Sequence, residues 1–140
     1  MSGPRHQARE AALQVLYFWE IGRTQADEAL DAFFAEHAPD ASDAVRRFAR
    51  DLVVGTTSEV PALDALIESH SRNWRMSRLA VVDRLILRMA AWELMHERDT
   101  PPAIVLDEAI ELARTFSGDD AARFINGVLD AISRALPIRE

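Results

Sequence analysis

The feature that most constrains the fold is the spacing of apolar residues, which recur every three to four positions along nearly the whole chain. This is the period of an amphipathic helix, whereas a half-buried strand requires strict alternation. No segment shows a convincing strand pattern, so the sequence predicts an all-α protein with about seven short helices. The expected helices cover about 4–21, 25–37, from Ser42 to a weak point at 55–57, from Pro61 to a connection at 71–77, 79–96, 103–115 and 119–135.

The chain of 140 residues corresponds to one compact domain. The weak point near Gly55–Pro61 divides it into two helical sub-bundles, at about 1–57 and 58–140. Gly22 is expected to end the first helix and Thr24 to cap the second. Asn126–Gly127 is usually a turn signal, but the apolar register continues across it, so we expect an unbroken helix there.

Composition removes several classes of chemistry. The chain contains no cysteine, and all 16 of its basic residues are arginine. Disulfides, thiol nucleophiles, zinc sites built on thiolates and phosphate loops that need a lysine are therefore excluded. No apolar run approaches 18 residues and the N-terminus has no apolar signal core, so we expect a cytoplasmic protein with no membrane span. The net charge of −7 argues against broad, nonspecific binding of nucleic acid.

The residues that could carry catalysis are not arranged for it. No two of the four histidines are spaced to share a helical metal face, and the HExxH-like string at His96 has Thr100 in place of its second ligand. Glu108 and Glu111 lie opposite the inward residues of their helix and indicate a solvated face rather than an acid/base pair. The sequence therefore favours a binding protein over an enzyme, with no metal and no cofactor.

Two basic clusters suggest binding. Arg5 and Arg9 stand four apart at a helix start with His6 beside them, an arrangement that attracts phosphate. The same spacing also fits a merely solubilising helix start. Arg123 and Phe124, one turn after Asp120, combine a cation with a ring that can stack a base. The alternative is an acidic helix start followed by a core phenylalanine.

A third candidate surface lies within 72–96. Arg84 and Arg88 are expected to form an outward pair four residues apart, while Trp74 and Trp92 are large amphipathic residues of the kind enriched at protein contacts. The alternative is an ordinary surface helix with Trp92 in the core.

Three stretches resemble the N-utilization substance B (NusB) family of bacterial transcription antitermination factors. They are RHQAREAALQVLYFWE at 5–20, VVDRLILRMAAWEL at 81–94 and AIVLDEAIELARTFSGDDAARFINGVLDAI at 103–132. The strings EAIELA and FINGVLD in the last stretch are the most specific. The resemblance covers essentially the whole chain.

The resemblance implies an all-helical fold of two perpendicular sub-bundles. It also implies binding of a single-stranded RNA element, boxA, together with the ribosomal protein NusE. That pair nucleates a complex with other Nus factors on RNA polymerase that suppresses termination, notably in ribosomal RNA operons. Some relatives are homodimers, and the sequence leaves this point open.

The resemblance also implies roles for individual residues. The residues matching the RNA-binding positions are Arg5, His6, Arg9, Tyr17, Asp120, Arg123 and Phe124. The helix that carries Asp83, Arg84 and Leu87 matches the side that faces NusE.

The chain departs from the family pattern at its N-terminus, where several relatives have a denser basic run. Only Arg5, Arg9 and His6 stand there in this sequence. We therefore expect weak RNA binding by the chain alone and a larger contribution from a partner. The alternative function is a purely protein-binding helical scaffold with a weakened RNA site.

Overall fold

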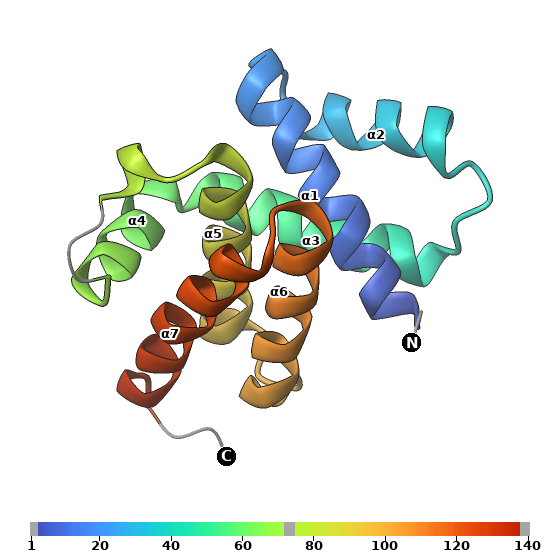
Figure 1. The fold of residues 1–140 in the computed structure, drawn as a ribbon. Helices are drawn as coiled ribbons and strands as arrows, with labels where there is room; N and C mark the ends of the chain where they lie inside the picture. The colour runs from blue at the N-terminus through green and yellow to red at the C-terminus, as the bar shows by residue number, and fades with distance from the viewer. Residues whose placement is uncertain (1–2, 72–74, 138–140) are drawn as a thin grey trace. The chain divides into compact units, whose positions relative to one another are not determined.

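The computed structural model describes residues 3–71 and 75–137, and Arg72 and Trp74 lie outside them. The described residues form seven α-helices and one short 3-10 turn, with no strand among them, which confirms the predicted all-α class (Figure 1). The helices are α1 (Pro4–Gly22), α2 (Ala26–His37), α3 (Asp43–Ser58), α4 (Val60–Ser69), α5 (Val81–His96), α6 (Pro102–Phe116) and α7 (Asp119–Ala135), and the turn η1 spans Met76–Arg78.

The chain forms two compact units, unit 1 up to Ser58 and unit 2 from Glu59 onward. In unit 1, α1 packs against both α2 and α3, and α2 also contacts α3. The apolar stripe of α3 is buried as its period predicts. Its buried residues are Val45, Phe48, Ala49, Leu52, Val53 and Thr56.

In unit 2, α5 is the central helix and contacts α4, α6 and α7. Its residues 85–91 are all buried, which is expected for a helix covered on several sides. α7 packs on α6 through a single buried stripe. Asn126–Gly127 lies in the interior of α7, so the predicted unbroken helix is confirmed.

The ends of the first helices differ from the prediction. Gly22 is still helical, and the chain turns at Arg23, whose φ of 54° lies in the left-handed region. Thr24 does not cap α2, because that helix begins one residue later and its N-cap residue, Gln25, makes no side-chain cap bond. Helix ends shift easily by one or two residues, since backbone and solvent can replace a missing cap.

The weak point at 55–57 does not break α3. The helix continues to Ser58, whose hydroxyl donates to the carbonyl of Val54 at 2.6 Å. Thr57 donates in the same way to Val53 at 2.9 Å. These bonds from hydroxyl to backbone satisfy polar groups of the last turn, so the fading apolar pattern ends the stripe before it ends the helix.

Candidate nucleic-acid and protein interface

The two N-terminal arginines converge on one aromatic ring. The guanidinium carbons of Arg5 and Arg9 lie 4.6 Å and 5.4 Å from the ring centroid of Phe48, which α3 supplies. Both distances are within the range of a cation–π contact. The predicted common side for the pair is therefore present, and the ring that both arginines contact belongs to Phe48, a residue of the buried stripe of α3.

Arg5 and Arg9 nevertheless differ in exposure. Arg5 is exposed at the first turn of α1, whereas Arg9 is only 3% exposed. A guanidinium that is buried cannot meet a phosphate directly unless it moves, so Arg5 is the one of the two that presents its charge at the surface. Sequence spacing could not distinguish the exposed arginine from the buried one, because it indicates which helix face a residue lies on and not how deeply its side chain is buried.

His6 lies beside an acid. Its Nε2 atom is 3.6 Å from Oε2 of Glu10, one turn along α1, and its side chain is 13% exposed. The Glu10 carboxylate offsets part of the positive charge at the start of α1. His6 therefore adds less to phosphate attraction than its position in the sequence implied.

Tyr17 belongs to an exposed apolar cluster on the last turns of α1. Tyr17, Phe18 and Ile21 are 41%, 47% and 56% exposed, and the two rings meet edge to face at 6.3 Å. The rise of a helix places Tyr17 about 18 Å along the axis from Arg5. Sequence reasoning singled out Tyr17 and missed Phe18 and Ile21, although the run Tyr-Phe-Trp was visible.

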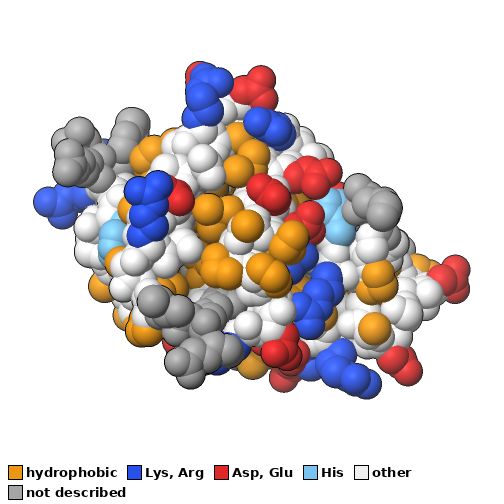
Figure 2. All heavy atoms as spheres, turned by 90° about the horizontal axis from the view of Figure 1, so that it is seen from below, with side chains coloured by type: hydrophobic (Ala, Val, Ile, Leu, Met, Phe, Trp, Pro, Cys, Tyr) orange, Lys and Arg blue, Asp and Glu red, His pale blue; other side chains and the backbone are white. Residues whose placement is uncertain are grey.

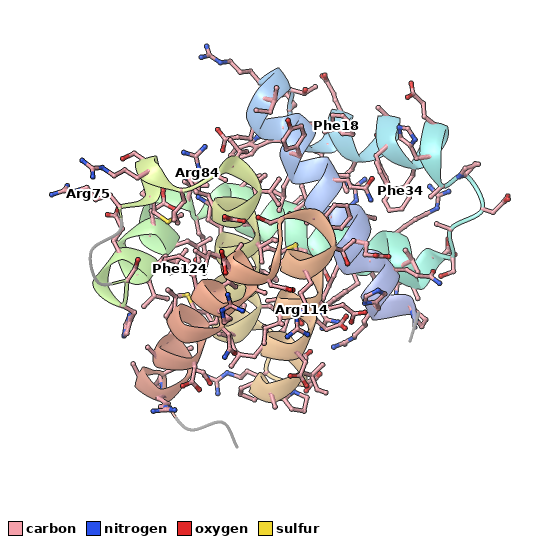
Figure 3. All side chains as sticks on the ribbon, viewed as in Figure 1. Phe18, Phe34, Arg75, Arg84, Arg114 and Phe124 are labelled. Carbon is pink, nitrogen blue, oxygen red and sulfur yellow. The ribbon has the colours of Figure 1, made fainter. Side chains whose placement is uncertain are left out.

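The acidic, basic and aromatic residues predicted near the RNA lie together in the first turns of α7, where the acidic and the basic side chain pair with each other. The guanidinium of Arg123 donates to the carboxylate of Asp120, and both side chains are largely exposed. Phe124, labelled in Figure 3, is half-buried, in agreement with its position at the edge of the apolar stripe. An exposed pair of this kind is weak and can be exchanged for another anion.

The residues expected to face a protein partner lie at the start of α5. Asp83 and Arg84 are half-buried, and one atom of each, Asp83 Oδ1 and Arg84 Nε, is buried without a hydrogen-bond partner among the described residues. Leu87 is fully buried, so its side chain belongs to the core and does not present a contact surface.

The predicted outward pair of Arg84 and Arg88 is wrong for Arg88. Its Nε and Nη2 atoms donate to Oδ1 and Oδ2 of Asp64 in α4, at 2.7 and 2.9 Å. The Arg88 side chain is 10% exposed and that of Asp64 is 25% exposed, so this is a largely buried two-point ion pair. Trp92 is half-buried and its Nε1 donates to Glu59 at 3.2 Å, which satisfies its polar atom inside unit 2.

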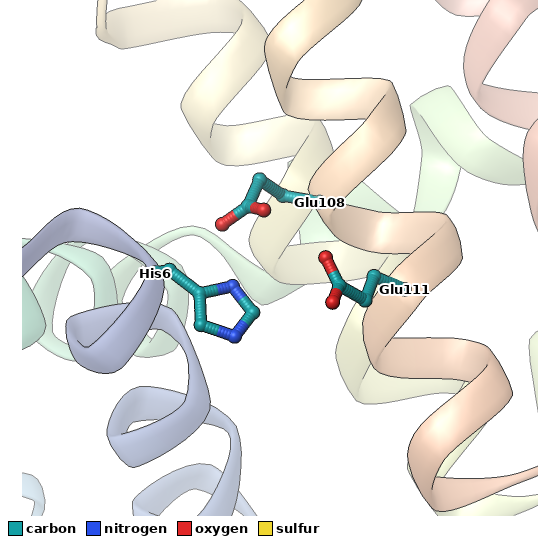
Figure 4. Close-up of side chains that lie close together, drawn as sticks. All are labelled: His6, Glu108 and Glu111. Carbon is teal, nitrogen blue, oxygen red and sulfur yellow. The ribbon is translucent and has the colours of Figure 1, made fainter. Parts of the chain in front are cut away.

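Glu108 and Glu111 leave the same side of α6 one turn apart (Figure 4, which also draws His6 of α1). Glu111 is exposed, as predicted, whereas Glu108 is half-buried.

On the face drawn in Figure 2, arginine side chains are interspersed with acidic and apolar ones. No helix of the described ranges is both long and apolar enough to cross a membrane.

Comparison with known proteins gives consistent matches. The NusB family model matches residues 6–134. A transcription antitermination protein NusB of Sorangium cellulosum is 42% identical over 134 residues, covering 96% of this chain and 94% of the relative.

Two solved structures have the same fold. A NusB from T. maritima aligns with a TM-score of 0.87 at 31% identity, covering 96% of this chain and 94% of that one. A crystal structure of the antitermination factors NusB and NusE in complex with double-stranded RNA also aligns with a TM-score of 0.87, at 29% identity, covering 97% of this chain and 100% of the matched one.

Proposed function

The chain belongs to the NusB family, and on that premise we propose that it acts in transcription antitermination by binding single-stranded RNA of the boxA type together with NusE. The family consists of non-enzymatic factors. The complex of RNA, NusE and this chain would join other Nus factors on RNA polymerase in the cytoplasm, with ribosomal RNA operons as its main targets.

The observation that carries the RNA part of the proposal is the stacking of Arg5 and Arg9 on Phe48. A ring beneath a guanidinium restricts its motion, so less conformational entropy is lost when the charge meets a phosphate. Tyr17, on the same helix, offers an exposed ring for a base. Arg123 and Phe124 are the candidate RNA contacts of unit 2, where Asp120 pairs with Arg123 in the absence of RNA, and Asp83 and Arg84 are the candidate contacts of NusE.

The test replaces Arg5 by Ala and measures binding of boxA RNA with NusE present. The matched control is Arg47→Ala, which removes the same charge from an exposed position on α3 of the same unit. We expect about tenfold weaker binding for Arg5→Ala, a salt slope smaller by about 0.7, and little change for the control. Equal losses in the two variants would remove Arg5 from the site.

A second candidate function is a NusE-binding scaffold that has lost most of its RNA affinity. It is favoured by the burial of Arg9 and by the pairing of Arg123 with Asp120. A titration of the chain with boxA RNA separates the two functions. An antitermination factor binds the RNA in a salt-sensitive manner once NusE is added. With about three phosphate contacts, affinity falls roughly 20-fold between 50 and 200 mM salt. The scaffold binds NusE equally well with and without RNA.

A further inference from the structure

Unit 1 contains a groove that none of the proposed RNA or NusE contacts explains. It has a volume of about 460 Å³ and is bordered by α1, by the C-terminal turns of α2, by the loop at 38–41 and by Val45 of α3. We call it the α1–α2 groove. Volumes of this order are typical of sites that accommodate small ligands or a few side chains.

The floor of the groove is aromatic. Phe33 and Phe34 are 6% and 4% exposed, and their rings meet edge to face at 5.5 Å. Figure 3 shows Phe34 pointing from α2 toward α3. His37 continues this aromatic surface, since its ring lies 5.3 Å from that of Phe33, while its Nε2 atom lies 3.8 Å from Oε2 of Glu36.

One wall of the groove is held in place by a single arginine. Arg46 of α3 donates to the carbonyls of Pro39 at 2.8 Å, Ala41 at 3.0 Å and Ala38 at 3.4 Å. Its guanidinium carbon also lies 5.0 Å from the centroid of Phe34. These contacts order the loop before any ligand arrives, so binding there loses little conformational entropy.

The rim of the groove is acidic. Glu10 of α1 and Asp40 of the loop supply carboxylates, Gln14 supplies an exposed amide, and the described lining contains no arginine. The adjacent C-terminal turn of α2 adds the exposed acid Glu36. A phosphate backbone is repelled by such a rim, whereas a cationic side chain is attracted to it.

We propose that the α1–α2 groove binds a short arginine- or lysine-bearing segment of a protein partner, with an apolar side chain of that segment on the Phe33 ring and its cation between Glu10 and Asp40. The cation's aliphatic stem covers the apolar floor while its charged end reaches the rim. This makes the groove a second protein-binding surface, in addition to the one proposed at Asp83 and Arg84.

The probe is an acetylated hexapeptide of alternating arginine and leucine, titrated into the full chain and followed by amide chemical shifts. We expect the largest shifts at Gln14, Phe33 and Asp40, and none with the peptide that has glutamate in place of arginine. The E10Q/D40N variant should bind at least fivefold more weakly, because two ion pairs are lost. Gln14→Arg should abolish binding by placing a guanidinium of this chain in the groove.

The matched control is E28Q/D51N, which removes two exposed charges of unit 1 outside the groove lining. It should bind the peptide as the unaltered chain does. If both double variants bind the peptide equally weakly, the loss comes from the lower net charge of the chain and the proposal is overturned. Shifts confined to residues outside the groove would overturn it as well.

Discussion

Two arginine pairs in this protein have the same spacing and different surroundings. Arg5 and Arg9 of α1 both reach the Phe48 ring, with Arg5 at the surface and Arg9 beneath it. In the other pair, Arg88 is locked into an ion pair with Asp64 while Arg84 is half-buried with one unpaired nitrogen. A spacing of four residues therefore determines which face of the helix an arginine shares, and the helix packed against that face determines what the arginine does.

The largest expected effect comes from Arg88→Met. Removing one member of a largely buried ion pair leaves the Asp64 carboxylate without its partner, so the free energy of unfolding should fall by about 3 kcal/mol. Urea unfolding measures this loss. Adding Asp64→Leu should restore much of it. A loss below about 1 kcal/mol would mean that Arg88 is as dispensable for folding as a surface arginine.

Arg84→Met tests the other arginine of α5. We expect affinity for NusE to fall about tenfold, which corresponds to about 1.4 kcal/mol. The free energy of unfolding should not fall, because the buried Nε atom has no hydrogen bond to lose. Calorimetric titration with NusE provides the measurement, and Arg98→Met is the charge-matched control. An unchanged NusE affinity would contradict the assignment of Arg84 to the interface.

Phe48→Leu tests the aromatic ring that both N-terminal arginines contact. The variant keeps an apolar side chain but removes the aromatic face under both guanidiniums, so boxA RNA should bind about fivefold more weakly and the fold should lose about 1 kcal/mol. Leu30→Val, in the core of the same unit, should lose similar stability with RNA affinity intact. If both variants weaken RNA binding equally, the effect is one of stability alone.

Asp120→Asn has the smallest expected effect, and its sign is opposite. Loss of the carboxylate removes a negative charge and makes the Arg123 guanidinium available to phosphate, so RNA affinity should rise about threefold. Asp130→Asn is the control, since Asp130 pairs with Arg134 at 2.6 Å in the same helix. Filter binding of boxA RNA with NusE present distinguishes the two variants. A decrease for Asp120→Asn would show that the carboxylate itself contacts the RNA.

Most of the fold was predictable because one signal, the apolar period, extends through every helix. The last helix was predicted as 119–135 and is observed as Asp119–Ala135, including Asn126–Gly127 in its interior. Local signals were less reliable. Thr24 has the right chemistry for a cap and does not act as one, and the fading pattern at 55–57 ends the apolar stripe without ending the helix.

The candidate sites were less predictable than the fold. Sequence reasoning found Arg5 and Arg123 as residue types in suitable positions, and the resemblance to the NusB family added Tyr17. It missed Phe48 as the platform for the arginines, because a core phenylalanine at helical spacing looks the same whether or not a cation covers it. The α1–α2 groove was missed as well, since its lining comes from three helices and a loop.

The apolar pattern was enough to show that the chain is helical and which faces of most helices are buried, and the sequence motifs identified its family. A period of three to four residues is a local property that can be read without knowing which helices are neighbours. The distinction between a surface arginine and a structural one required the packed structure. The partner of Arg88 lies 24 positions away and that of Arg9 lies on another helix, so a side chain's role is set by contacts that spacing along one helix does not encode.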